Sequence, residues 1–284
     1  MSASAARASR DWQLVLPLAL FFVVFVFAPL GLLGAVSAFS DGALQVMGPQ
    51  QYAKFFGDAY NRGVLLQTLT LAFETTLLAL VLGYPLAYLY TLAPRGLQRA
   101  LLLAIVLPLL TSAIVRTFAW VVILGRQGIV NGALAALGWI DAPLKLLYTP
   151  AAVVVAQAQI ELPLMVLPLI TALAGIDPNL RQASASLGAG QWRTFFAVTL
   201  PLSAPGLLAG CLLVFSAAAS GFVTQTLVGG GQLMYMPFYI YQQSIQLNNY
   251  PFAAAIALVL LASVLTIVTL VNFLGRRSRG FVHA

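Results

Sequence analysis

The chain has 284 residues, of which 61% are hydrophobic and 7% are charged, and its formal net charge is +7. Soluble domains carry about 25% charged residues, so this composition excludes a soluble enzyme, a disordered chain and a fibrous repeat. A mean hydropathy of +0.95 indicates a polytopic membrane protein. In such a protein, positive charge is typical of cytoplasmic loops that face anionic lipid, and we do not expect nucleic-acid binding.

A single cysteine, Cys211, and a single histidine, His283, limit the chemistry that the chain can carry. One cysteine cannot form an internal disulfide or a zinc site. A lone histidine close to the C-terminus argues against a metal site and against a Ser-His-Asp triad. Cys211 lies in an apolar run, where we expect a small core residue. We therefore expect a chain that is not an enzyme and that holds no metal or cofactor of its own.

Six apolar runs are long enough to cross a bilayer as helices, which takes about 20 residues each. The first run is longer than the apolar core of a signal peptide, about 7–15 residues, so we interpret it as an uncleaved span. The sequence predicts an all-α polytopic membrane protein that forms one transmembrane domain over residues 1–284. The predicted spans are about 14–38, 64–92, 100–124, 151–176, 205–227 and 252–275, and a loop at 177–204 joins the fourth to the fifth.

Six spans place both termini on one side of the membrane, and the basic residues indicate which side this is. Cytoplasmic loops are enriched in Lys and Arg. Nine arginines fall on the side of the termini and four basic residues fall on the other, so we expect cytoplasmic termini. The nine are Arg7, Arg10, Arg95, Arg99, Arg181, Arg193, Arg276, Arg277 and Arg279, and the four are Lys54, Arg62, Arg126 and Lys145.

Residues 177–201 carry the clearest local pattern. Asp177 is suited to cap a helix, and Gly188 is suited to end it, because glycine adopts the positive φ that a helix stop requires. A second short helix with an aromatic stripe follows, and we expect Pro201 to stop it. The pattern predicts a helix–Gly–helix hairpin along the cytoplasmic membrane face, with an ordinary amphipathic loop on lipid as the alternative. The aromatic stripe consists of Trp192, Phe195 and Phe196.

The residues that define this hairpin are Gln182-Ala183-Ser184, Gly188, Phe195, Val198, Leu200-Pro201 and Pro205-Gly206. They resemble the EAA loop of ABC-importer permeases, whose short helices insert into a cleft on a cytoplasmic ATPase subunit. The resemblance implies that Gln182, Ala183, Ser184, Gly188 and Phe195 couple the chain to an ATPase. Gln182 stands where the family usually has Glu, so the length and hydrogen-bonding ability are kept while the charge is lost.

Three further stretches, at 115–131, 162–169 and 221–230, are similar to permeases of the spermidine/putrescine type. The resemblance implies a permease subunit in the bacterial inner membrane that forms half of a pore for a polyamine or a similar small cation. It also implies a second homologous permease, two ATPase subunits, an external solute-binding protein and membrane lipid as partners. No Walker loop of the form G-x-x-x-x-G-K-[ST] is present, so we expect ATP and Mg²⁺ on the separate ATPase subunits.

Three charged side chains lie within the predicted spans, where a charge is costly and usually faces a cavity or a partner. Arg116 is a candidate for a structural ion pair or for contacts with backbone carbonyl groups. Glu161 lies just before Pro163, where the helix must kink or lose a hydrogen bond. It is a candidate for the substrate pathway, with packing or pairing to Arg116 as alternatives. Glu74 is a further candidate for the pathway.

Polar and aromatic residues can extend this pathway. Gln157 and Gln159 flank the same turn as Glu161. Aromatic rings can hold a cation on their π-faces, and Trp120, Tyr235 and Tyr239 are candidates, with packing or a position in an interfacial belt as the alternative. Carboxylates and rings together suit a cationic solute.

A different class of transporter is also compatible with two intramembrane acids. In an ion-coupled secondary transporter, Glu74 or Glu161 would relay protons. Such a carrier would not need a helix–Gly–helix loop, and its transport would survive ATP depletion as long as the ion gradient was held.

Overall fold

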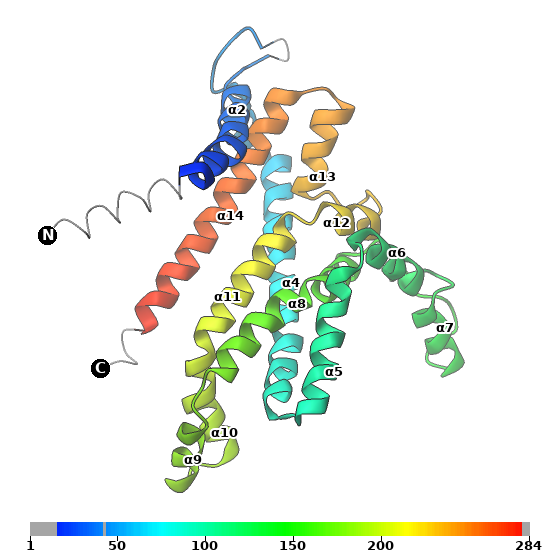
Figure 1. Cartoon of the computed structure of the whole chain (residues 1–284). Helices are drawn as coiled ribbons and strands as arrows, with labels where there is room; N and C mark the ends of the chain where they lie inside the picture. Colours follow the sequence, from blue (N-terminus) through cyan, green and yellow to red (C-terminus); the bar gives the residue numbers. More distant parts are fainter. Residues whose placement is uncertain (1–15, 42–43, 280–284) are drawn as a thin grey trace, which may run out of the picture. The chain divides into compact units, whose positions relative to one another are not determined.

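The computed structural model describes residues 16–41 and 44–279, and these residues are predominantly helical (Figure 1). Within these ranges the only β-pairing is one isolated bridge between Phe39 and Met47. The described residues contain six helical segments that are long and apolar enough to cross a membrane, which confirms the all-α polytopic fold. These segments are Leu16–Ser37, Ala59–Leu92, Ala113–Ala136, Pro150–Ala174, Gln191–Ala219 and Tyr250–Gly275. Arg7, Arg10 and His283 lie outside the described residues.

The individual helical elements make up and connect these segments. In chain order they are η1 (Val23–Phe27), α2 (Ala28–Ser37), α3 (Gln50–Gly57), α4 (Ala59–Leu92), α5 (Arg95–Val106), η2 (Leu107–Leu110), α6 (Ala113–Leu124), α7 (Ile129–Ala136), α8 (Pro150–Ala174), α9 (Pro178–Ser186), α10 (Gln191–Thr194), η3 (Phe195–Thr199), α11 (Leu200–Ala219), α12 (Phe222–Gly229), α13 (Met236–Tyr241), η4 (Gln242–Gln246) and α14 (Tyr250–Arg279).

The chain divides into two compact units. Unit 1 comprises the described residues up to Arg62 together with Tyr239–Leu261, and unit 2 comprises the remainder. Aromatic packing holds unit 1 together. The Phe252 ring is 1% exposed, lies edge-on to the Tyr239 ring and has the Lys54 ammonium 4.1 Å from its centroid.

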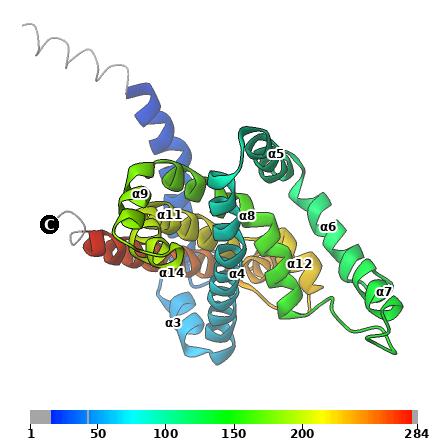
Figure 2. The same ribbon diagram turned by 90° about the horizontal axis from the view of Figure 1, so that it is seen from below.

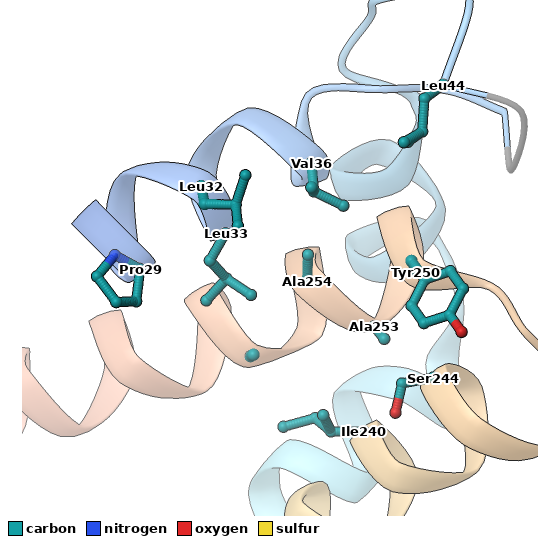
Figure 3. Close-up of a pocket in the computed structure, with 11 residues that line it drawn as sticks. Pro29, Leu32, Leu33, Val36, Leu44, Ile240, Ser244, Tyr250, Ala253 and Ala254 are labelled. Atoms are coloured by element: carbon teal, nitrogen blue, oxygen red, sulfur yellow. The ribbon is translucent and has the colours of Figure 1, made fainter. Parts of the chain in front are cut away.

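Unit 1 also contains an apolar hollow of about 500 Å³ between α2 and the first turns of α14 (Figure 3). Its walls are almost entirely hydrocarbon, and none of the described residues that line it is charged. A hollow of this kind does not suit a charged solute. The lining residues are Pro29, Leu32, Leu33, Val36, Leu44, Ile240, Ser244, Tyr250, Ala253, Ala254 and Ala257.

The core of unit 2 forms where α8 and α11 pack side by side (Figures 1 and 2). Two glycines of α11 bring the helices close together. A Cβ on Gly206 would lie 2.5 Å from the Pro168 carbonyl oxygen, and one on Gly210 would lie 3.0 Å from the Met165 carbonyl oxygen. Small residues at such crossings let helix backbones approach within van der Waals contact.

The predicted third span at 100–124 is wrong as a single helix. After α5, a short 3-10 turn leads to Thr111, whose backbone is extended at φ −94° and ψ 147°, and α6 then begins. Pro108 has no N–H to continue the α-helical ladder, which explains the interruption. The apolar segment in this region that is long enough to cross a membrane is Ala113–Ala136, in which a turn at residues 125–128 separates α6 from α7. In both views α6 and α7 extend away from α11 (Figure 2).

The predicted fifth span at 205–227 differs from the helix in the structure at both ends. The chain is helical from Gln191 to Ala219, so Pro201 does not stop the second short helix. The N–H of Leu200 donates to the carbonyl of Phe195, five residues earlier, and this widened π turn accommodates the proline. At the other end, α11 stops at Ala219 and α12 begins after Gly221. The other described span ends lie within five residues of the predictions.

Candidate functional site

The hairpin between α8 and α11 has the predicted local structure. The Asp177 carboxylate accepts a hydrogen bond of 2.9 Å from the Asn179 N–H and so caps α9. Gly188 has φ +79°, a conformation that L side chains rarely adopt, and it turns the chain toward α10. The hairpin, α9 and α10, lies at the ends of α8 and α11 (Figure 1).

The five predicted coupling residues divide into an outer and an inner set. Gln182, Ala183 and Gly188 are exposed, and open space surrounds the position that a Cβ on Gly188 would take. Ser184 and Phe195 are half-buried and face the rest of the chain. At the bend, Leu187 is 88% exposed.

The inner face of the hairpin packs against α4. The Phe195 ring lies edge-on to both Tyr84 and Tyr88, with 5.6 Å between ring centroids in each case. The Arg181 guanidinium stands 5.6 Å from the centroid of the Tyr88 ring. The Tyr84 hydroxyl lies 2.9 Å from the Ser203 hydroxyl of α11. We call Tyr84, Tyr88 and Phe195 the aromatic joint.

Sequence reasoning did not find the two tyrosines of the aromatic joint. Their spacing of four residues places them on one face of α4, and that spacing, together with the aromatic stripe of the hairpin, was the available signal. A hollow of about 330 Å³ adjoins the joint, so the rings have free space on one side. It is lined by Tyr84, Pro85, Tyr88, Gln191, Trp192 and Phe195.

Arg116 takes the second of its two predicted roles, contact with the backbone. Its Nη1 donates to the carbonyl oxygen of Ile160 at 3.1 Å. Pro163 offers no N–H to the preceding turn of α8, which loosens the helix at this point. Glu161 follows Ile160 directly, is half-buried and lies within the electrostatic reach of Arg116. The structure therefore brings these two charges to one place.

Trp120 belongs to the same contact between α6 and α8. Its Nε1 donates to the Oε1 of Gln159 at 3.0 Å. Thr117 directly follows Arg116 on α6, and its hydroxyl lies 3.2 Å from the hydroxyl of Thr224 on α12. These bonds join α6 to α8 and α12, so Trp120 and Arg116 both act in holding these helices together.

Glu74 lies in a different environment. Its side chain is exposed on α4, and within the described part of the chain it has no hydrogen bond or ion pair. It borders a hollow of about 310 Å³ that also contains Tyr235. Burial, and secondarily the Glu74 carboxylate, raises the pKa of Tyr235 to about 12, so its phenol stays protonated. The lining residues are Leu66, Gln67, Thr70, Leu71, Glu74, Pro150, Leu233 and Tyr235.

Tyr239, the remaining pathway candidate, lies in unit 1. Its hydroxyl donates to the Oδ1 of Asn61 at 2.7 Å, and its ring lies edge-on to Tyr60 at 5.9 Å between centroids. The side chain is 7% exposed. These contacts describe a packed residue of unit 1, whereas Glu74 and Tyr235 line a hollow of unit 2.

Two buried glutamines stabilise the break between α11 and α12. The Nε2 atoms of Gln157 and Gln225 both donate to the Ala218 carbonyl oxygen, at 2.9 and 2.8 Å. A Cβ on Gly221 would lie 2.1 Å from the Gln157 Nε2, so a larger residue there would have to displace this amide. Sequence reasoning placed Gln157 along the pathway, but it did not predict the break or the role of Gln225.

The whole hairpin, with α8 and α11, lies within the part of the chain that matches a known family. Residues 79–280 match the family described as binding-protein-dependent transport system inner membrane component. The chain belongs to this family. It is therefore a transport permease subunit of the ABC-importer class, in an inner membrane, and the alternative of a secondary transporter finds no support. Glu74 lies just before the matched residues.

Three curated relatives illustrate the similarity. The spermidine/putrescine transport system permease protein PotB of Escherichia coli K12 is 34% identical over 242 residues, which cover 84% of this chain and 88% of that protein. PotB of Salmonella typhimurium strain SL1344 is also 34% identical over 242 residues, 84% of each chain. A putative 2-aminoethylphosphonate permease, PhnU of Salmonella paratyphi A, is 29% identical over 251 residues, 87% of this chain and 84% of PhnU.

Solved structures show the same fold. A bacterial ABC transporter involved in the import of the acidic polysaccharide alginate superposes with a TM-score of 0.80 at 22% identity, over 96% of this chain and 98% of that one. The alginate transporter in complex with its alginate pentasaccharide-bound periplasmic protein gives a TM-score of 0.79 at 21% identity, over 96% of each chain. At this identity the likeness supports the fold of the chain.

Proposed function

We propose that the chain forms half of the translocation pore of an ATP-driven importer for a polyamine such as spermidine or putrescine. The observation that carries this proposal is the 34% identity to PotB permeases over 84% of the chain. The aminoethylphosphonate permease is less similar, at 29%. Glu74, a carboxylate in a spanning helix with no partner among the described residues, agrees with a cationic solute.

The remaining half of the pore is a second, similar permease. Two ATPase subunits, which hold ATP and Mg²⁺, bind the exposed face of the hairpin, and an external solute-binding protein delivers the solute. The exposed Gln182, Ala183 and Leu187 support the ATPase contact. The excess of basic residues beside the termini supports a cytoplasmic hairpin and cytoplasmic termini in the bacterial inner membrane.

The contacts of the hairpin suggest how ATPase motion reaches the pore. The aromatic joint links the hairpin to α4, and the Tyr84 hydroxyl links the same turn of α4 to α11. Glu74 lies ten residues before Tyr84 on α4, about 15 Å along the helix at 1.5 Å per residue. Movement of the hairpin as a lever would therefore displace the helix that carries Glu74. The chain itself carries out no covalent step.

Reconstitution of the complete importer tests this function. The chain, its companion permease, the ATPases and the binding protein are placed in proteoliposomes, and uptake of labelled spermidine is measured with and without enclosed ATP. We expect uptake that requires both ATP and the binding protein and that unlabelled putrescine inhibits. Competition by 2-aminoethylphosphonate but not by putrescine would show that the solute is an aminophosphonate and not a polyamine. Uptake driven by an ion gradient without ATP would refute the ATP-driven mechanism.

A further inference from the structure

Glu74 and Glu161 are the two acids of the spanning helices, and their surroundings differ. Glu161 is half-buried, and the Arg116 guanidinium binds the carbonyl oxygen of the preceding residue, Ile160, so a positive charge of the chain itself already lies near it. Glu74 is exposed on α4 with no hydrogen bond or ion pair among the described residues. Because an unpaired carboxylate at bilayer depth is too costly to face lipid, its side chain must face water, a solute or another subunit.

The side of α4 that carries Glu74 also carries two neutral polar groups. Gln67, Thr70 and Glu74 all line the hollow, and their spacing of three and four residues places them on one face of the helix. A carboxylate, an amide oxygen and a hydroxyl oxygen are hydrogen-bond acceptors. Such a row suits a donor that carries positive charge and several N–H groups.

A backbone hydrogen bond holds the Tyr235 side of the hollow in position. Tyr235 precedes α13, and the N–H of the next residue, Met236, donates to the Oγ1 of Thr68 on α4 at 2.9 Å in a fully buried bond. This bond ties the Tyr235 segment to the helix that carries Glu74. Tyr235 is 4% exposed and packs with Leu71 and Val153. The ring is therefore held in place before any solute arrives.

The remaining walls are apolar. Leu66, Leu233 and Pro150 line the hollow beside the polar face. Hydrocarbon walls next to a carboxylate and an aromatic ring match an alkyl ammonium, whose methylene groups pack against leucines while its charged end meets the acid and the π-face. A volume of about 310 Å³ lies at the small end of ligand pockets, which run from about 300 to 1,000 Å³.

We propose that this hollow is a binding subsite for one ammonium group of an alkyl amine, with the Glu74 carboxylate as its charge partner and Tyr235 as its aromatic wall. The inference rests on the proposed function in so far as the amine is a transported solute. The sequence alone favoured Glu161 as the principal acid of the pathway. We assign this role to Glu74 instead, because Glu161 already has Arg116 beside it.

The test compares two measurements in the assembled importer. The first is spermidine uptake by Glu74→Gln, with Glu74→Asp as the charge-retaining variant and Glu161→Gln as the matched change at the other acid. We expect Glu74→Gln to lower uptake about tenfold or more, as for a lost charged hydrogen bond, and Glu74→Asp to recover part of it. ATP hydrolysis stimulated by the loaded binding protein should remain, so more ATP is used per solute.

The second measurement detects binding without transport. Leu66→Cys, in a Cys211→Ala background, places a thiol in an apolar wall of the hollow. We expect putrescine, but not the uncharged butanediol of the same length, to slow the reaction of this thiol with a small thiosulfonate reagent. Glu74→Gln in the same background should abolish the protection.

The outcomes separate this inference from the proposed function. Normal uptake kinetics and unchanged putrescine protection in Glu74→Gln would overturn the subsite while leaving a polyamine importer intact. Protection that depends on Glu74, in an importer that takes up no polyamine, would support the subsite and refute the polyamine as the solute. Equal protection by putrescine and by butanediol would overturn the assignment of an ammonium group.

Discussion

The hydroxyl groups of Ser184 and Thr194 lie 2.9 Å apart and join the two short helices of the hairpin across the Gly188 bend. The angle between the helices therefore depends on a side-chain bond as well as on the backbone at Gly188. Ser184 is the third residue of the EAA-type motif. It is half-buried and braces the hairpin through this contact, whereas Gln182 and Ala183 are exposed.

Removing this bond should weaken coupling without unfolding the chain. A hydrogen bond between neutral groups contributes about 0.5–1.5 kcal/mol, so Ser184→Ala or Thr194→Val should lower the solute transported per ATP roughly two- to tenfold while assembly is kept. Ser186→Ala is the matched control, since the Ser186 hydroxyl donates to the Gln182 carbonyl of its own helix. A larger effect in the control than in Ser184→Ala would contradict the bracing role.

The outward face of the hairpin should be intolerant of charge. Ala183→Asp adds a carboxylate to an exposed position, where the chain itself loses little but a packed ATPase contact would have to bury an unpaired charge. We expect normal membrane insertion with ATP hydrolysis uncoupled from transport, measured as the ratio of the two rates. If Ala183→Asp assembles and transports normally, the hairpin does not bind an ATPase through this face.

Gly188 needs a different substitution, because φ +79° strains any residue with a Cβ. Asn tolerates the left-handed conformation better than other residues, so Gly188→Asn separates backbone strain from steric interference with a partner. Nothing in the described part of the chain lies within 4 Å of an added Cβ, so the Cβ itself meets no clash within the chain.

The aromatic joint should transmit movement of the hairpin to α4. Phe195→Ala removes a ring that contacts both Tyr84 and Tyr88. Truncating a buried Phe to Ala costs about 3–5 kcal/mol, and a half-buried ring should cost less. We expect a lower midpoint of thermal unfolding and a reduced transport-to-ATP ratio. Phe196→Ala is the control, because Phe196 is 60% exposed, and equal uncoupling by both variants would argue against the joint.

The fold was largely readable from the sequence because apolar runs and glycine positions act locally. The number of spanning helices, the Asp177 cap and the Gly188 bend all follow from residues close in the chain. The interruption at Thr111 and the continuity through Pro201 were not predicted. Both depend on whether a proline is accommodated by a wider turn or breaks the helix, and packing against other helices decides this.

The site was less predictable, since it depends on contacts between residues far apart in the chain. Glu74 and Tyr235 are separated by 161 positions, and only the fold places them around one hollow. The two intramembrane acids look equivalent in the sequence. Their different surroundings follow from Arg116, which reaches the turn of Glu161 and not that of Glu74.

The helix break at Gly221 should depend on Gln157. In Gly221→Ala the added Cβ would lie 2.1 Å from the Gln157 Nε2 and displace an amide that is 1% exposed. A buried polar group that loses its partner costs about 1–3 kcal/mol, so the unfolding midpoint of the purified complex should fall. Gln157→Ala in the same chain removes the clash and should restore part of the midpoint. Independent, additive losses in the double variant would contradict a direct contact.

Glu161 and Arg116 should depend on each other for the stability of the chain. The Arg116 guanidinium binds the Ile160 carbonyl oxygen through Nη1, and its buried Nε has no partner among the described residues. The nearby Glu161 carboxylate offsets this positive charge. Glu161→Gln keeps the shape but leaves the half-buried Arg116 cation without a nearby counter-charge. Removing one partner of a buried charge pair is destabilising. We therefore expect a lower yield of folded complex and a lower unfolding midpoint.

Adding Arg116→Gln should restore much of that yield, because the uncompensated charge is then absent as well. Arg116→Gln alone should also destabilise, since it removes the contact with the Ile160 carbonyl and strands the carboxylate. Thermal stability and spermidine uptake of the two single variants and the double variant form a double-mutant cycle. A coupling energy near zero would show that the two charges act independently. A selective loss of uptake in Glu161→Gln at unchanged stability would instead return Glu161 to the solute pathway.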